Sequence, residues 1–198
     1  DAHVVVLEEH DVAAQADLLE RQIAPFLAGL ASTTRVNGFE TDYPGRVTDW
    51  RGFRRHDFTL EGLACVLVEP NVPADPERRW FWRARFFGAF PFVDLALLKR
   101  GWHVAHVAVD ELYGSPESNR RFDVLHAFLA SLGFNRKCAL AGFSRGGLDS
   151  CNWAVRNPAK VSSLYLDNAV CDFKSWPGGK GRGPGDSASW HRCLAAWG

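Results

Sequence analysis

The stretch Lys137-Cys-Ala-Leu-Ala-Gly-Phe-Ser-Arg-Gly-Gly147 decides the fold of this chain. Its apolar first half predicts a buried strand, and the residues from the glycine pair to about Arg156 predict a helix. Ser144 lies between them, two residues after Gly142 and two residues before Gly146, in the spacing G-x-S-x-G. In this context the spacing predicts a sharp strand-to-helix turn with the serine at its tip.

Such a turn supplies the chemistry that a nucleophilic serine needs. Side chains at Gly142 and Gly146 would collide with the packed strand and helix, so glycine is required there, and the Ser144 hydroxyl is pushed out at the edge of the sheet. The helix N-terminus favours an anion at this place, and the backbone N–H of Arg145 would form one arm of an oxyanion hole. The alternative is a glycine-rich turn without chemistry.

The pattern around this turn alternates strands with helices. A helix is predicted from Ser115, a side chain suited to an N-cap, with Pro116 in the first position. Helical crossovers between strands predict an α/β fold, a mainly parallel twisted sheet with helices on both faces. The predicted strands are Lys137–Phe143 and, elsewhere in the chain, His56–Leu60, Ala64–Glu69, Trp80–Phe87, Trp102–Val109 and Val161–Leu166.

Composition limits the function more than it defines it. The chain has 198 residues, 46% of them apolar, and a formal net charge of +0, so neither a nucleic-acid partner nor an anionic membrane surface is indicated. No apolar run is long enough for a membrane span. The five cysteines include no C-x-x-C pair, which predicts buried free thiols rather than a zinc site. The compartment stays open.

Two regions are predicted along the chain. Residues 1–45 hold an amphipathic helix, Asp11–Gly29, and a polar, turn-rich linker. Residues 46–198 hold the alternating strands and helices. The loop after the strand Trp80–Phe87 would supply the second oxyanion donor, the backbone N–H of Phe87 or Gly88, unless it is an ordinary strand end.

The motifs together resemble the α/β-hydrolase superfamily, from Trp50 to about Gly185. More narrowly, the chain looks like bacterial prolyl-oligopeptidase-like and esterase-like hydrolases. The resemblance implies a serine hydrolase that forms an acyl-enzyme on Ser144 with a small ester or amide, without a metal or organic cofactor. It is carried by Trp82-Arg83-Ala84-Arg85-Phe86-Phe87-Gly88, Asp110-Glu111-Leu112-Tyr113-Gly114-Ser115-Pro116, Ser144-Arg145-Gly146-Gly147-Leu148 and 171–181.

The resemblance also implies a catalytic acid and then a histidine after the serine. The strands that usually precede them do not follow Val161–Leu166, so the domain is expected to be C-terminally incomplete, with its base beyond residue 198 and little activity in this piece alone. Within the chain, Asp167 and Asp172 are candidate acids and His191 is a candidate base. The alternatives are hydrogen bonding within a loop for the aspartates and a surface position for the histidine.

The predicted function is that of an esterase on carbohydrate or other small esters. The alternatives are a prolyl-oligopeptidase-like peptidase and a non-catalytic binding module of the same fold. Arg145 is expected to brace the turn through an ion pair rather than to bind an acidic substrate group. The carboxylates expected within its reach are Asp110, Glu111, Asp167 and Asp172.

Overall fold

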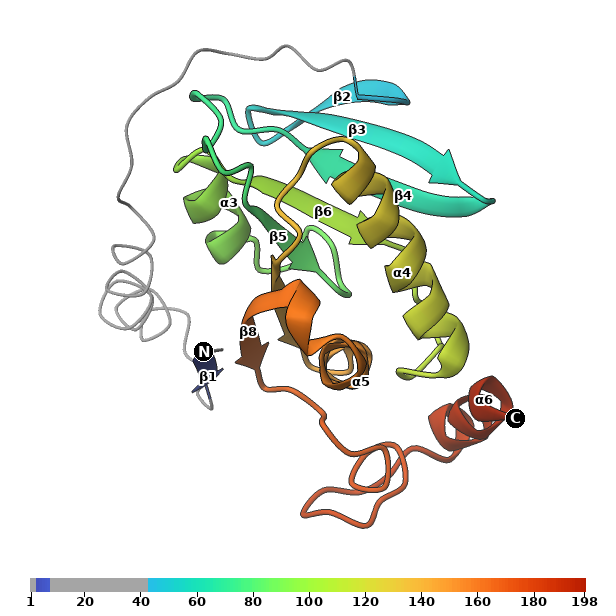
Figure 1. The fold of residues 1–198 in the computed structure, drawn as a ribbon. Helices are drawn as coiled ribbons and strands as arrows, with labels where there is room; N and C mark the ends of the chain where they lie inside the picture. The colour runs from blue at the N-terminus through green and yellow to red at the C-terminus, as the bar shows by residue number, and fades with distance from the viewer. Residues whose placement is uncertain (1–2, 8–42) are drawn as a thin grey trace.

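A computed structural model describes residues 3–7 and 43–198 of the chain, and it contains one eight-stranded sheet in the order β1-β8-β7-β5-β6-β4-β3-β2 (Figure 1). The strands are β1 His3–Leu7, β2 Arg46–Trp50, β3 Phe53–Leu60, β4 Leu63–Val68, β5 Trp80–Arg83, β6 His103–Val107, β7 Cys138–Phe143 and β8 Val161–Asp167. The helices are α3 Phe92–Leu98, α4 Pro116–Ser131, α5 Gly146–Arg156, the short 3-10 helix Pro158–Lys160 and α6 Ser187–Trp197. The predicted helix Asp11–Gly29 and the linker after it lie outside the described residues.

The strand directions confirm the predicted fold class. Strands β1, β8, β7, β5 and β6 are parallel to one another, whereas β4, β3 and β2 form a meander whose strands are antiparallel, with β4 antiparallel to β6. Helices α3, α4 and α5 are the crossovers between successive parallel strands. The β1–β8 pairing was not predicted, and it places the start of the chain at one edge of the sheet.

The meander is built from two tight turns. Glu61 and Gly62 join β3 to β4 with φ angles of 49° and 79°, and Arg51 and Gly52 join β2 to β3 with φ angles of 55° and 85°. Two consecutive positive φ angles are the geometry that matches the right-handed twist of paired strands. The predicted strands His56–Leu60 and Ala64–Glu69 correspond to β3 and β4 of this hairpin, while β2 was missed because most of its side chains are exposed at the sheet's far edge.

Strand β5 is shorter than the sequence predicted. It ends at Arg83 rather than at Phe87, and Phe86 adopts a φ of +55°, which no strand residue adopts. Trp80, Trp82 and Ala84 pack in the core on one face of the sheet, but Phe86 packs with the core of the opposite face. The apolar alternation therefore continues past the end of the strand, into a loop that lies beside Ser144.

The core has one half on each face of the sheet. On one face, the side chains of α4 and α5 cover Trp80 and Trp82, and the Trp82 ring lies 4.4 Å from the Phe122 ring and 5.0 Å from the Trp153 ring, centroid to centroid. On the other face, α3 covers the opposite side chains of the same strands. Burying aromatic rings of this size is a major stabilising contribution. The abundant Trp and Phe residues thus act mainly as core.

The helix termini follow the residues that predicted them. Ser115 caps α4, where its hydroxyl accepts a hydrogen bond from the Ser118 N–H at 3.5 Å, and Pro116 takes the first helical position. Helices α3 and α6 were not predicted. Within residues 43–198, no helix is long and apolar enough to cross a bilayer.

Candidate active site

Ser144 lies where the sequence predicted it. Strand β7 ends at Phe143, between the parallel strands β5 and β8, and α5 begins at Gly146. Ser144 itself has a φ of +48°, a region that a residue with a β-carbon adopts at an energetic cost. Its side chain is exposed while Phe143 and Gly146 are buried. The hydroxyl is thus presented at the C-terminal edge of the sheet, on a strained turn.

The glycines around Ser144 are required by close contacts. A β-carbon on Gly142 would lie 2.9 Å from both the Gly147 Cα and the Leu166 Cδ2. A β-carbon on Gly147 would lie 2.6 Å from the Val170 carbonyl oxygen and 2.7 Å from the Ala169 β-carbon. Strand β7, helix α5 and the chain that follows β8 therefore meet at distances that only glycine permits.

Two backbone hydrogen bonds tie Ser144 to the chain that follows β8. The Ser144 N–H donates to the Asp167 carbonyl oxygen at 3.0 Å, and the Val170 N–H donates to the Ser144 carbonyl oxygen at 2.9 Å. The turn is thus held from both sides, by its own strand and helix and by residues 167–170. This bracing keeps the strained φ of Ser144 in place.

Replacing Gly147 by Ala is expected to lower the free energy of unfolding by about 1–3 kcal/mol, because the added methyl group overpacks the contact with Val170 and Ala169. Urea denaturation followed by tryptophan fluorescence measures the change. Gly183→Ala is the matched control, since a β-carbon there meets nothing within 4 Å. Equal stability of the two variants would mean that residues 169–170 move away without cost.

The candidate oxyanion donors fall on two segments that touch. The Arg145 N–H donates no backbone or side-chain hydrogen bond to any described residue, and neither do the N–H groups of Phe86, Phe87 and Gly88. A β-carbon on Gly146 would lie 3.7 Å from the Arg85 backbone nitrogen. This contact places Arg85, the residue before Phe86, against the start of α5.

The two candidate acids differ in position. Asp167 is the last residue of β8 and pairs in register with Phe143, directly before the serine, and its carboxylate accepts a hydrogen bond from the Tyr165 hydroxyl at 3.4 Å. Asp172 is exposed, and its carboxylate accepts the Lys174 N–H at 2.8 Å. Asp172 thus stabilises a loop turn, the alternative that the sequence left open, while Asp167 stays next to Ser144.

The histidines of residues 43–198 are all engaged away from Ser144. His191 is exposed on α6, with its Nδ1 at 2.7 Å from the Ser187 carbonyl oxygen of the same helix. The hydrogen bond of His191 is thus made within its own helix, and no hydrogen bond joins it to Ser144 among the described residues. The other histidines of this range bond to other groups: His56 to Glu69, His103 to Tyr43, His106 to the Arg83 carbonyl oxygen and His126 to the Arg136 carbonyl oxygen.

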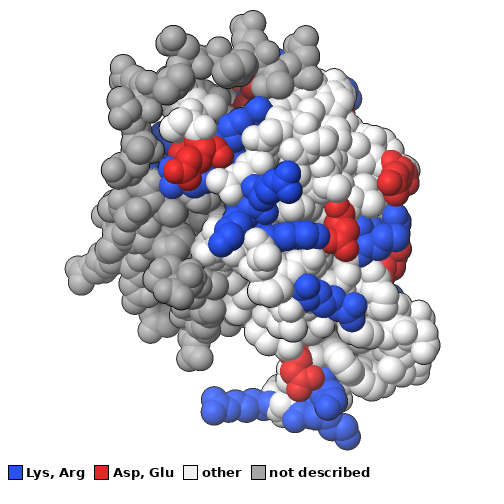
Figure 2. Space-filling view, in the orientation of Figure 1, with Lys and Arg blue, Asp and Glu red and all other residues white. Residues whose placement is uncertain are grey.

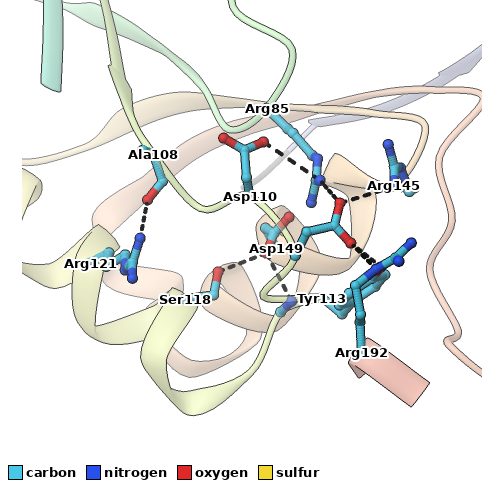
Figure 3. A network of polar contacts seen from close by, with 11 residues as sticks. Arg85, Ala108, Asp110, Tyr113, Ser118, Arg121, Arg145, Asp149 and Arg192 are labelled. Atoms are coloured by element: carbon cyan, nitrogen blue, oxygen red, sulfur yellow. Dashed lines mark hydrogen bonds and ion pairs between the residues drawn. The ribbon is translucent and has the colours of Figure 1, made fainter. Parts of the chain in front are cut away.

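Three arginines converge on one carboxylate beside the turn, in a set that we call the Glu111 cluster (Figure 3). Its members are Glu111, Tyr113, Arg85, Arg145 and Arg192. Arg85 Nη2 and Arg145 Nη1 lie 3.1 Å and 3.4 Å from one Glu111 oxygen, Oε1. The other oxygen, Oε2, accepts from the Tyr113 hydroxyl and, at 2.8 Å, from Arg192 Nε.

The Glu111 cluster confirms the expected role of Arg145 as a brace. The hydrogen bond from Tyr113, followed by those from the arginines, lowers the pKa of Glu111, so this carboxylate is charged at neutral pH. The Arg145 guanidinium also lies 5.6 Å from the Phe86 ring centroid and 5.5 Å from that of Trp176. One arginine thereby joins the loops after β5, β6 and β8 above the turn.

Asp149 is a buried carboxylate beneath the same region. It lies on α5, is 1% exposed, and accepts hydrogen bonds from the Gly114 N–H at 2.8 Å and the Ser118 hydroxyl at 2.7 Å. Burial raises its pKa to about 6, against the lowering effect of these two hydrogen bonds. Asp149 thus fixes the loop that carries Glu111 and Tyr113 to the helix that follows Ser144.

Sequence reasoning missed most of this polar network. Arg85, Arg192 and Asp149 are far apart in the sequence, and no spacing links them.

Within the described residues, no group of three or more His, Cys, Asp or Glu side chains is placed to hold a metal ion. On the face shown in Figure 2, basic and acidic side chains are interspersed among uncharged ones.

The sheet and the turn together define a class of protein. A mainly parallel sheet, with an antiparallel strand beside it and a serine on a strained strand-to-helix turn at its C-terminal edge, is the α/β-hydrolase fold. No family model matches the chain, and no curated protein matches it in sequence.

Solved structures with this fold resemble the chain at low sequence identity. An esterase from an Arctic intertidal metagenomic library is 13% identical, with a TM-score of 0.49 over 64% of this chain and 65% of that one. Epoxide hydrolase A from Mycobacterium thermoresistibile is 20% identical, with a TM-score of 0.42 over 58% and 38%. A bacterial membrane phospholipase A is 22% identical, with a TM-score of 0.42 over 78% and 48%. The match thus spans less than two thirds of each of these structures.

Proposed function

We propose that this chain carries the nucleophile of a serine hydrolase and that Ser144 forms an acyl-enzyme with a small ester. The observation that carries the proposal is the position of Ser144, an exposed hydroxyl at a φ of +48° between the end of β7 and the start of α5. A strained residue held by its surroundings is a recurrent feature of reactive sites. The N-terminus of α5 also favours the negative charge that develops during attack.

The oxyanion hole is proposed to use the N–H groups of Arg145 and Phe86. Both groups donate no hydrogen bond to the described residues, and they come from the two segments that touch at Gly146. Donors that are already in place stabilise a developing oxyanion without reorganisation. Phe87 and Gly88 follow on the same loop and remain alternatives for the second donor.

Asp167 is the proposed acid, because it ends the strand next to the one that carries Ser144. The base is proposed to come from outside residues 43–198, since every histidine in that range bonds elsewhere. The same observation favours a second candidate, a binding module with the hydrolase fold and no catalysis. Activity measurements separate the two proposals.

The test is hydrolysis of p-nitrophenyl acetate and p-nitrophenyl butyrate by the longest natural chain that contains these residues. Ser144→Ala is expected to reduce kcat/KM by at least about a thousandfold, because a triad without its nucleophile keeps only the contributions of binding and oxyanion stabilisation. Ser131→Ala, at an exposed serine at the end of α4, is the matched control and is expected to leave the rate unchanged.

Two further arms of this experiment distinguish the alternatives. Hydrolysis of a prolyl dipeptide anilide in preference to the esters would favour a peptidase of the prolyl-oligopeptidase type. If wild-type protein and Ser144→Ala have the same rate on all substrates, the catalytic role of Ser144 is refuted and a binding module remains. Assaying residues 1–198 alone then shows how much of the rate depends on residues outside this segment.

A further inference from the structure

Two of the five cysteines lie together at the surface beside the Ser144 turn. The Sγ atoms of Cys151 and Cys171 are 3.8 Å apart, and both cysteines are free. Cys171 is exposed and Cys151 is partly exposed, whereas Cys65, Cys138 and Cys193 are buried. The prediction of buried free thiols thus holds for three cysteines and is wrong for this pair.

The surrounding packing brings the two thiols next to each other. Cys151 lies one helical turn after Gly147 on α5, and residues four apart share one face of a helix. The Gly147 backbone touches Ala169 and Val170, the two residues before Cys171, and the Val170 N–H is bonded to Ser144. Tight contacts at one turn of the helix therefore place Cys171 beside Cys151 at the next.

We propose that Cys151 and Cys171 are a modification site, at which a reversible disulfide forms and fastens residues 168–172 to α5. The bond needs the sulfur atoms to approach from their present separation to about 2 Å. One partner is on a loop, which can make this movement, and the other is on a helix, which holds still. The inference does not depend on the hydrolase activity.

The oxidant in this reaction is a low-molecular-weight disulfide such as oxidised glutathione. The exposed Cys171 thiolate attacks the glutathione disulfide, forms a mixed disulfide and releases one glutathione thiolate. The Cys151 thiolate then attacks the Cys171 sulfur and releases the second glutathione. Two protein S–H bonds are lost and one S–S bond forms, while the electrons reduce the oxidant to two thiols.

The second step requires the thiolate form of Cys151. Burial and the neighbouring Cys171 raise the pKa of Cys151 to about 12, so its thiolate is scarce at neutral pH. Once Cys171 is part of a mixed disulfide, it has no thiolate charge, so it no longer raises the pKa of Cys151 in this way. Closure is therefore expected to quicken as the pH rises, since more of the attacking thiolate is present.

The experiment is peptide mapping of the whole chain after incubation with oxidised glutathione, alkylation of the remaining thiols and digestion with trypsin. Trypsin cleaves after Arg145, Arg156, Lys160 and Lys174, so the sequence places Cys151 alone in peptide 146–156 and Cys171 alone in peptide 161–174. The other cysteines fall in 56–78, 138–145 and 193–198. The expected product is peptide 146–156 linked to peptide 161–174 by a disulfide. This product is expected to disappear on reduction and to form in monomeric protein.

Thermal melting supplies a second measurement on the same samples. A cross-link restricts the unfolded chain, so the oxidised wild-type protein is expected to melt several degrees higher than the reduced protein. Cys171→Ser is expected to show no linked peptide and no change of Tm with oxidant. Glutathione retained on Cys171 without cross-linking, links to other cysteines, or disulfides between chains would overturn the proposal.

Discussion

Replacing Asp94 by Ala is expected to lower the free energy of unfolding by about 3–5 kcal/mol, because the Arg83 guanidinium would be left buried without its counter-ion. Arg83 and Asp94 are 0% and 1% exposed, and Arg83 Nη1 lies 3.0 Å from the Asp94 carboxylate. The guanidinium also lies 3.7 Å from the centroid of the Phe143 ring. The residue directly before Ser144 thus rests on this ion pair.

Urea denaturation of three variants tests the ion pair. Glu77→Ala is the matched control, since Glu77 lies at the exposed end of a pair with Arg79 and its loss is expected to cost less than about 0.5 kcal/mol. The double variant Arg83→Met, Asp94→Leu is expected to recover most of the stability lost by Asp94→Ala. A loss below about 1 kcal/mol in Asp94→Ala would mean that water or another group reaches Arg83.

The second expected result concerns pH. Replacing Asp149 by Asn is expected to stabilise the protein relative to wild type as the pH rises from about 4 to 7, by up to about 3 kcal/mol. Burial raises the pKa of Asp149 in the folded protein to about 6 from the ordinary 3.8. In that window the folded protein binds more protons than the unfolded chain, so the wild-type stability due to this group falls as the pH rises. Asn keeps the acceptor for Gly114 and Ser118 without the charge.

The measurement is the difference in unfolding free energy between variant and wild type at several pH values. Glu117→Gln gives a control of opposite sign, because Arg120 and then Arg121 lower the pKa of Glu117 to about 2 from the ordinary 4.5. Its contribution is present above about pH 4.5 and lost towards pH 2, so this variant loses stability relative to wild type as the pH rises. A pH-independent difference for Asp149→Asn would show that Asp149 is not protonated in the folded protein near pH 5.

The sequence predicted those parts of the fold in which local signals and tertiary packing agree. Gly62 suits the positive φ angle of its turn, and Ser115-Pro116 combines a residue suited to an N-cap with a proline suited to the first helical position. Helix α3 was missed because its seven residues, Phe92–Leu98, are nearly all apolar and have no clear periodicity. Strand β5 was overextended because the alternation continues through Arg85 to Phe86, while the chain bends at Arg85 and Phe86 has a positive φ.

The candidate site also has parts that the sequence predicted and parts that it did not. Ser144 and its glycines form one continuous motif. The close contacts at Gly142 and Gly147 require glycine at these positions, so the motif can be recognised in the sequence. The pairing of Arg145 with a carboxylate was also predictable, because several acids follow strand ends. The contribution of Arg192 was not, since α6 reaches Glu111 only through the path of the intervening loop, which has no regular pattern.

The position of β1 has a consequence for the order in which the protein assembles. Strand β1 precedes every other described strand in the sequence, whereas its partner β8 is the last of them. The meander β2–β4 forms between strands that are close in the sequence and can close early, whereas β1 cannot pair until β8 has been synthesised. Until then, the ribosome-bound chain carries an unpaired apolar strand. We expect β1 to be the last strand to acquire protection in pulsed hydrogen exchange during refolding.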